Sequence, residues 1–200
     1  MKKVLITGSE GFIGKNLKEK LKDKGIYPIE FKGDIVHLAA LTSLPDSLKY
    51  PLDYFLTNTL GTIGLLEYAR QNRIKKVIFT SSIAATKPDN PYGLSKKQAE
   101  EWCNYYAKTY GIETYILRIQ NVYGPKNKKG VIYIFANQKL GNKKLTIHGT
   151  GKQTKDFIHI DDVVDGIVKL LQIKTGDKIS INKLAKMMEN APKKKLRDLL

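Results

Sequence analysis

The spacing of Tyr92 and Lys96 could place a proton-transferring phenol beside a cation. Apolar residues recur at helical spacing from Tyr92 to Tyr110, and Lys96 falls on this apolar side, one turn after Tyr92. A cation so close stabilises the phenolate form of tyrosine, whose free pKa is about 10. Tyr92 could then accept the proton of a substrate hydroxyl near neutral pH. The alternative is a core tyrosine beside a lysine whose stem is buried and whose ammonium reaches solvent.

A glycine pattern follows the first apolar run of the chain, in the sequence VLITGSEGFIGKNL. Gly8, Gly11 and Gly14 lie between an expected strand and an expected helix. Gly8 allows a tight turn, Gly11 lets backbone N–H groups approach a pyrophosphate at the helix N-terminus, and Gly14 lets the helix pack close to the sheet. We therefore expect a dinucleotide at this loop, the alternative being a plain strand–helix turn.

The type of dinucleotide depends on the residues that follow this helix. An acid about 20 residues beyond the glycines would hold the adenosine ribose. Both Asp34 and Glu30 are candidates, and Lys32 between them could favour a 2′-phosphate instead. The sequence favours NAD and leaves NADP open.

Short apolar runs alternate with helical patterns through the first part of the chain. The runs are rich in valine or isoleucine and continuous, as in strands buried on both faces of a parallel sheet. Their alternation with helices is typical of an α/β, Rossmann-type, doubly wound fold. Asn90 can cap one helix, and Pro91 suits its first turn. We expect strands at 3–7, 34–40, 76–82 and 113–119, an edge strand within 26–31, and helices at 12–24, 52–72 and 93–110.

The pattern changes after Pro125, which indicates a second, smaller unit. We expect a Rossmann domain at 1–125 and a small substrate-binding lobe at 126–200 that is interleaved with it. The tail of this lobe is basic. Within the lobe the patterns indicate helices at 131–140, 160–172 and 180–189, and a short strand with a turn at 143–149.

Composition argues against several classes of protein. The 200 residues carry a formal net charge of +16, but the excess is scattered lysine without the arginine stripe and interleaved aromatics of a nucleic-acid binder. A single cysteine, Cys103, rules out an internal disulfide, and His37, His148 and His159 lack partners at metal-ligand spacing. No apolar run approaches the roughly 18–20 residues of a membrane span. We expect a cytoplasmic protein without metal, nucleic-acid or membrane partners.

Several segments, in order, resemble the extended short-chain dehydrogenase/reductase family, in particular its nucleotide-sugar epimerases and dehydratases. They include the glycine loop TGSEGFIG, the segment HLAA, the strand VIFTSS and the Tyr-x-x-x-Lys pair in YGLSK. The resemblance extends from Met1 to about Met188. The matching segments are 7–14, 37–40, 58–70, 77–82, 92–96, 117–125 and 145–167.

This resemblance implies a role for each site residue. Tyr92 is the proton-transferring phenol, Lys96 binds the nicotinamide ribose and lowers the pKa of Tyr92, and Ser82 hydrogen-bonds the sugar oxygen. The implied site for NAD consists of Gly8, Gly11, Phe12, Ile13, Gly14, Asp34, Ile35, Leu38, Ala39, Ala40, Asn58, Thr80, Tyr92 and Lys96. The implied site for a nucleotide-diphosphate sugar consists of Ser82, Asn121, Val122 and Lys155.

The residues after Ser82 narrow the reaction. Dehydratases of the family usually carry a carboxylate directly after the serine or threonine, whereas this chain reads SSIAAT. This favours a 4-epimerase, which oxidises the sugar reversibly with NAD and re-presents its other face. A 4,6-dehydratase or a 4-keto reductase is the alternative. The resemblance also implies a homodimer formed by the helices at 52–72 and 93–110.

Departures from the family pattern lie in the loops. Little sequence separates the first helix from residue 34, only nine residues (83–91) precede Tyr92, and Lys155 stands where an arginine is common. An alternative of another class is therefore a trimmed, non-catalytic protein that senses the redox state of NAD(P). The presence of Ser82, Tyr92 and Lys96 favours the enzyme, because a binding protein has no need for all three.

Overall fold

The computed structural model describes most of the chain, and the structural statements below concern only these residues. The helix expected at 180–189 and the basic tail lie outside them, as do Glu30, Lys32 and His148. Among the described helices, none is long and apolar enough to cross a membrane. The described ranges are 3–23, 27–28, 33–147, 151–152 and 154–172.

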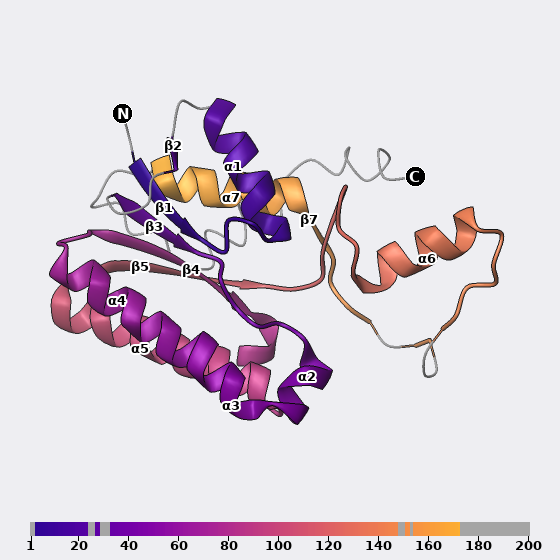
Figure 1. Cartoon of the computed structure of the whole chain (residues 1–200), viewed down its shortest axis with the longest axis horizontal. Coiled ribbons are helices and arrows are strands. Elements are labelled where there is room, and N and C mark those ends of the chain that lie inside the picture. The colour runs from indigo at the N-terminus through magenta and orange to yellow at the C-terminus, as the bar shows by residue number, and fades with distance from the viewer. Residues whose placement is uncertain (1–2, 24–26, 29–32, 148–150, 153, 173–200) are drawn as a thin grey trace.

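Five parallel strands of the described chain form the central sheet, in the order β2-β1-β3-β4-β5 (Figure 1). β4 is buried along its whole length, in keeping with the apolar run at residues 77–79 within it. The predicted parallel sheet is confirmed, and Pro28 lies in its edge strand β2, where a missing backbone donor is tolerated. The bounds are β1 Lys3–Thr7, β2 Tyr27–Pro28, β3 Asp34–His37, β4 Lys76–Ser82 and β5 Glu113–Ile119.

β3 is shorter than the predicted strand at 34–40, because the chain leaves the ladder after His37. The Leu38 amide still donates to the Thr7 carbonyl at 3.2 Å, but the Ala39 amide donates to the Thr7 side chain at 3.3 Å. Residues 38–40 therefore continue as a loop past the end of β1, beside the glycine loop.

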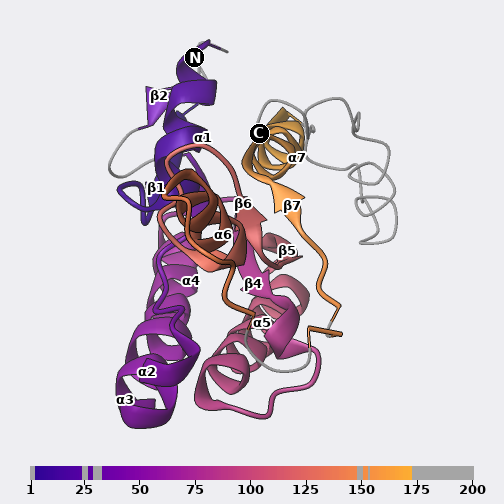
Figure 2. The same ribbon diagram turned by 90° about the vertical axis from the view of Figure 1, so that its right-hand side faces the viewer.

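In the described part of the chain, two long helices cover each face of the sheet (Figures 1 and 2). α1 (Phe12–Asp23) and α7 (Ile160–Gln172) pack on one face, and α4 (Gly61–Gln71) and α5 (Pro91–Tyr110) pack on the other. The predicted cap of α5 is confirmed, since Asn90 Oδ1 accepts a hydrogen bond from the Gly93 amide at 2.9 Å. This arrangement is the doubly wound fold expected from the sequence.

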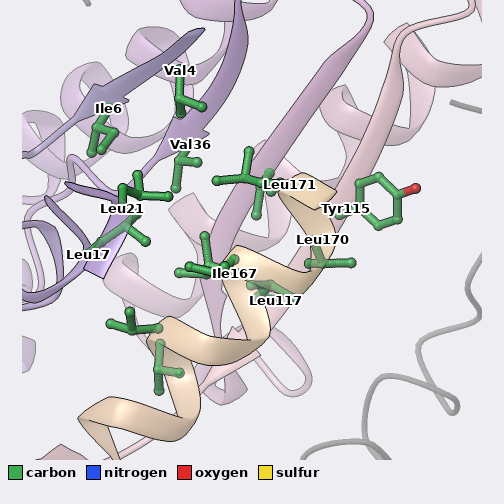
Figure 3. Close-up of a cluster of buried hydrophobic side chains, with 14 of the residues drawn as sticks. Val4, Ile6, Leu17, Leu21, Val36, Tyr115, Leu117, Ile167, Leu170 and Leu171 are labelled. Carbon is green, nitrogen blue, oxygen red and sulfur yellow. The ribbon is translucent and has the colours of Figure 1, made fainter. Parts of the chain in front are cut away.

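A buried apolar cluster joins α1 and α7 to the sheet (Figure 3). α7 comes from the segment 126–200 but shares this core with β1 and β3, and the division into two lobes at residue 125 stays a prediction. The buried ammonium of Lys76, at the start of β4, also donates to the Leu170 carbonyl in the last turn of α7 at 3.0 Å. The labelled members of the cluster are Val4, Ile6, Leu17, Leu21, Val36, Tyr115, Leu117, Ile167, Leu170 and Leu171.

The region expected as one helix at 52–72 consists of three helical pieces. α3 (Pro51–Tyr54), a π-helix (Phe55–Leu60) and α4 follow one another directly. A further short helix, α2 (Leu44–Lys49), precedes them and was not indicated by the sequence pattern. The wider π turn places Asn58 and Thr59 in the interior. Single π turns of this kind are frequent at functional sites.

The chain after β5 forms a small separate sheet and an outlying helix. β6 (Val122–Tyr123) pairs with β7 (Ile158–His159), and α6 (Gly130–Leu140) lies beyond them (Figure 1). α6 confirms the helix expected at 131–140. The prediction of a strand at 143–149 is wrong for its described part, residues 143–147, which are exposed and form no strand. The Thr146 amide donates to the Gln138 side chain at 3.1 Å, and no described strand bonds it.

Replacement of Ile167 tests the contribution of α7 to stability. Ile167 is fully buried, so Ile167→Ala should lower the free energy of unfolding by about 2–5 kcal/mol through lost contacts and a cavity. Lys169→Ala, at an exposed position of the same helix, should change it by no more than about 0.5 kcal/mol. Urea denaturation compares the two variants, and equal effects would contradict the packing of α7 on the sheet.

Candidate active site

A cleft of about 730 Å³ opens where β3, β4 and β5 end. In open α/β sheets ligands bind at this edge, near the point where the strand order reverses, which here lies between β1 and β3. The lining residues come from the ends of the strands, the start of α5 and the segments before β6 and β7. Those predicted from the sequence are Ile13, Leu38, Ala40, Thr80, Ser82, Tyr92, Lys96, Asn121, Val122 and Lys155.

Ser82, Tyr92 and Lys96 meet in this cleft, although their roles stay predictions. Ser82 is the last residue of β4, and the other two lie in the first turns of α5. The helix start approaches the strand end closely: a Cβ on Gly93 would lie 2.7 Å from the Ala84 carbonyl oxygen. The Tyr92 hydroxyl consequently lies close enough to the Ser82 hydroxyl to interact with it.

The pKa of the Tyr92 phenol is raised above its ordinary value, mainly because burial disfavours the phenolate. The nearby Ser82 hydroxyl lowers this pKa, and the neighbouring Tyr54 raises it. The lowering of the Tyr92 pKa by Lys96 stays a prediction. The Lys96 ammonium lies against β4, with Nζ 4.4 Å from the centre of the Phe79 ring.

Lys96 is nearly enclosed, with 3% of its surface exposed. Burial lowers the pKa of its ammonium to about 8, and Cys103 and Glu100 on the same helix act in the opposite direction. The side chain is therefore mostly charged at pH 7. It also lines the cleft, and no hydrogen bond ties its ammonium to another described residue, so it can donate to a bound ligand.

A chain of buried hydrogen bonds runs from the end of β1 through His37. His37 Nδ1 is 2.6 Å from Thr7 Oγ1, and its Nε2 is 3.0 Å from Thr62 Oγ1. The Thr62 hydroxyl donates to the Asn58 carbonyl at 2.6 Å, so Nε2 of His37 must carry the proton that bonds Thr62. Burial, assisted by the charge of Lys96, lowers the pKa of His37 to about 3 and keeps the ring neutral.

Asn58 extends this chain to α5 and lies inside the protein, not on the cleft. Its Oδ1 accepts from the Leu41 amide at 2.8 Å, and its Nδ2 donates to the Leu41 carbonyl at 2.9 Å and to Ser95 Oγ at 3.0 Å. Ser95 in turn donates to the Tyr92 carbonyl at 2.8 Å. Because its side-chain amide is fully engaged and 1% exposed, Asn58 positions the site and does not reach a cofactor with its side chain.

The glycine loop fits a dinucleotide. Gly8 has a φ of +68°, and a Cβ there would lie 2.7 Å from the Ala39 nitrogen. A Cβ on Gly14 would collide with the Gly8 carbonyl, whereas Gly11 is exposed at the start of α1. The two packed glycines thus bring the loop against its neighbours, and Gly11 leaves the helix N-terminus open to a pyrophosphate.

Asp34 and Ile35 do not reach the site that the sequence assigned to them. Asp34 is the first residue of β3, and Ile35 is fully buried in the core beneath the sheet. The first residue of a parallel strand lies at the edge opposite the ligand, so Asp34 cannot hold the adenosine ribose there. Of the other predicted residues, Phe12 packs on the core and Ala39 adjoins Gly8.

The side of the cleft formed by the segments after β5 and before β7 includes residues that the sequence did not predict. Asn121 Nδ2 donates to the Asp156 carbonyl at 2.8 Å, and Gln120 Nε2 donates to Asp156 Oδ2 at 2.6 Å. These bonds hold residues 154–156 beside the end of β5, and the two-residue pairing of β6 with β7 is too short to leave a sequence pattern. The lining residues that were not predicted are Thr42, Leu44, Ser81, Ile83, Ala84, Ile119, Gln120, Thr154 and Asp156. Within the described residues, no group of three or more possible ligands could hold a metal ion.

The fold and the cleft together define a class of protein. A glycine loop after the first strand of a parallel α/β sheet forms a dinucleotide-binding fold. In this fold, Ser82, Tyr92 and Lys96 occupy the edge of the sheet at which ligands bind. The combination is that of an extended short-chain dehydrogenase/reductase.

Comparison with known proteins identifies the family. Residues 31–182 match the NAD dependent epimerase/dehydratase family. A Methanocaldococcus jannaschii protein provisionally assigned as a UDP-glucose 4-epimerase is 32% identical, over 90% of this chain and 79% of its own length. A dTDP-D-glucose 4,6-dehydratase of Dictyostelium discoideum is 29% identical, over 86% of this chain and 56% of its own length. The structure of a Bacillus cereus UDP-glucuronic acid 4-epimerase in complex with UDP-glucuronic acid and NAD has a TM-score of 0.78 and 27% identity, covering 94% of this chain and 82% of that one.

This chain therefore belongs to the NAD dependent epimerase/dehydratase family, whose cofactor is NAD. The relatives include both an epimerase and a dehydratase at similar identity, so membership does not by itself fix the reaction. The chain spans little more than half the length of the dehydratase.

The buried His37 predicts a pH-dependent stability. Its folded pKa of about 3 lies below its ordinary value of 6.5, so the unfolded state takes up the proton first as the pH falls. This contribution to stability is complete above pH 6.5 and decreases below it, by about 2 kcal/mol at pH 5. His37→Gln should be less stable at pH 7.5 but should lose less stability between pH 7 and pH 5. Urea denaturation at each pH measures both slopes, and equal slopes would contradict a neutral buried His37.

Proposed function

We propose that the chain is a 4-epimerase of a nucleotide-diphosphate sugar, acting through transient oxidation of the sugar with NAD. The observation that carries this proposal is the meeting of Ser82, Tyr92 and Lys96 in one cleft that also contains Asn121 and Lys155. A proton-transfer group and groups that can bind a phosphorylated sugar thus face the same space.

NAD, when bound, supplies a hydride acceptor that later returns the hydride to the sugar carbon. The residues that would hold it are those of the glycine loop between Gly8 and Gly14, the loop at 38–40, Thr80 and Lys96. Ile13 at the start of α1 and Leu38 place apolar surface on this side of the cleft.

Tyr92 is the proposed acceptor of the sugar hydroxyl proton. Its hydroxyl lies near that of Ser82, so a sugar oxygen that accepts a hydrogen bond from Ser82 would also lie within reach of Tyr92. Because burial raises the pKa of Tyr92, formation of the phenolate needs a cation nearby, and the enclosed ammonium of Lys96 lies one turn away. The phenol returns the proton when the sugar is reduced on its other face, so the cycle needs no second base.

The lining of the cleft favours epimerisation over loss of water. Elimination needs an acid and a base at neighbouring carbons, but Ser82 is followed by the apolar residues Ile83 and Ala84. Among the described lining residues Asp156 is the one carboxylate, and it is bound by Gln120. The similarity to a UDP-glucuronic acid 4-epimerase with NAD supports the same reading.

Tyr92→Phe removes the proposed proton acceptor and leaves the ring. We expect turnover to fall by at least about 10²–10⁴-fold, the usual contribution of a general base, with little change in NAD affinity. Tyr105→Phe is the matched control, since Tyr105 is exposed on the same helix and should keep full turnover. Retained turnover in Tyr92→Phe would overturn the role of Tyr92.

The reaction itself is tested by incubating the purified chain with NAD and a panel of UDP-, dTDP-, GDP- and CDP-sugars. A 4-epimer as product supports the proposal. A 4-keto-6-deoxy product identifies a dehydratase, and reduction of an added 4-keto sugar identifies a reductase. NAD binding without any product would support the non-catalytic sensor.

We also propose that the chain forms a homodimer through α4 and α5. These helices lie side by side on one face of the sheet (Figure 1). Large apolar side chains are exposed on α5 and on the π-helix that precedes α4. Trp102, Tyr105 and Tyr110 form an exposed aromatic group on α5, and Leu56 and Leu60 are exposed before α4. A cytoplasmic location stays a prediction from the sequence.

Trp102→Glu should weaken this dimer, because burying a carboxylate in an apolar interface is costly. Sedimentation at micromolar concentration should show a dimer for the unmodified chain and a shift toward the 22.6 kDa monomer for the variant. Leu140→Glu, on the outlying helix α6, is the control and should remain dimeric. A 22.6 kDa species alone for the unmodified chain would count against the dimer.

A further inference from the structure

Glu100 lies buried on α5, although no step of the proposed reaction uses it. Its side chain is 2% exposed. Oε1 accepts a hydrogen bond from the Ser81 hydroxyl at 2.5 Å, and Arg118 donates to both carboxylate oxygens, from Nε to Oε1 at 2.9 Å and from Nη2 to Oε2 at 2.6 Å. Burial raises the pKa of this carboxyl, but the bonds from Arg118 and Ser81 lower it further than burial raises it. Glu100 is therefore a fixed, buried negative charge.

The two partners of Glu100 come from neighbouring strands at the level of the cleft. Ser81 of β4 and Arg118 of β5 are directly paired in the sheet. The next residues of these strands, Ser82 and Ile119, line the cleft. A single carboxylate on α5 is thus bonded to both strands where they reach the cleft, which Ser81 itself also lines.

The contact of Glu100 with Arg118 is directional. Its geometry is better suited to orienting α5 against the sheet than to stabilising the fold. The Glu100 carboxylate is buried but 41% of the Arg118 side chain is exposed, and ion pairs that reach solvent contribute little net stability. A guanidinium that donates two bonds to one carboxylate nevertheless allows a narrow range of orientations. The two hydrogen bonds between Arg118 and Glu100 therefore fix the position of α5 along β4 and β5. That position sets the distances from Tyr92 and Lys96 to Ser82.

Glu100 also affects the charge of Lys96, one helical turn before it. The titratable groups around Lys96 are Tyr92, Glu100 and Cys103 on α5, His37 on β3 and Arg118 on β5. His37 is neutral and Arg118 is bound to Glu100. Burial drives Lys96 toward its neutral form, and the negative charge of Glu100 opposes that tendency.

We propose that Glu100, held by Ser81 and Arg118, is a positioning residue that fixes Tyr92 and Lys96 relative to Ser82. The kinetic part of this inference rests on the proposed function. The effect of Glu100 on the Lys96 ammonium, one turn away on the same helix, does not, because it is a property of the chain without any ligand.

The experiment compares Glu100→Gln with Glu101→Gln. Glu101 is the neighbouring residue, exposed and paired with Lys97 at the surface at 3.6 Å, so it is a matched control. Titration of the Lys96 side chain by NMR in the cofactor-free protein measures its pKa directly. Glu100→Gln should lower this pKa from about 8 by about one further unit, because a nearby opposite charge is lost, and Glu101→Gln should leave it unchanged.

Kinetic measurements distinguish an effect of Glu100 on the positions of Tyr92 and Lys96 from an effect on the charge of Lys96. In Glu100→Gln we expect kcat to fall about 10²-fold with little change in KM, as misplacement of reacting groups does, and the alkaline limb of the pH profile to move to lower pH with Lys96. Glu100→Asp keeps the charge but shortens the side chain, so the pKa of Lys96 should recover while kcat stays low. Ser81→Ala removes one bond to Glu100 and should lower kcat by a smaller factor.

The outcomes distinguish this proposal from its alternatives. A lower melting temperature for Glu100→Gln, with the Lys96 pKa, kcat and pH profile of the Glu101→Gln control, would overturn the positioning role. If Glu100→Gln does not fold, Glu100→Asp and Ser81→Ala decide the question, and unchanged kcat in both would overturn it. If the unmodified chain binds NAD but converts no sugar, the proposed function fails, while the Lys96 titration still tests the effect of Glu100.

Discussion

The side-chain amide of Asn58 is the contact on which the arrangement of the site depends. It bonds the loop after β3 through Leu41 and helix α5 through Ser95. The backbone carbonyl of Asn58 continues the chain through Thr62 to His37. In a buried environment each of these groups needs its partner, so moving one element leaves a costly unpaired atom in another. The π turn at Phe55–Leu60 is the local distortion that brings Asn58 inside.

Burial acts on Tyr92 and Lys96 in opposite directions, and this links their charges. It raises the pKa of the phenol and lowers that of the ammonium, so each side chain by itself is driven toward its neutral form. A phenolate and an ammonium in the same enclosed site would attract each other more strongly than in water. In the proposed reaction, the helical spacing of the two residues therefore matters most when a substrate hydroxyl gives up its proton.

Two further buried groups frame this pair. Burial and the charge of Lys96 keep His37 neutral, whereas the hydrogen bonds from Arg118 and Ser81 keep Glu100 charged. The partners of His37 fit the neutral ring, because Thr7 donates to one ring nitrogen and Thr62 accepts from the other. The result is one negative charge near Lys96 and no competing positive charge from the histidine.

The sequence by itself determined the features that depend on neighbours along the chain. Continuous apolar runs specified β1, β4 and β5, Asn90 and Pro91 specified the start of α5, and the Tyr92–Lys96 spacing specified which side chains share a helix face. The tertiary structure alone decided that Asp34 lies at the wrong edge of the sheet, that Asn58 points inward, and that Glu100 meets Arg118. Those outcomes depend on which residue of one element faces which residue of another. That register arises only when the whole sheet and its helices pack, so no local pattern carries it.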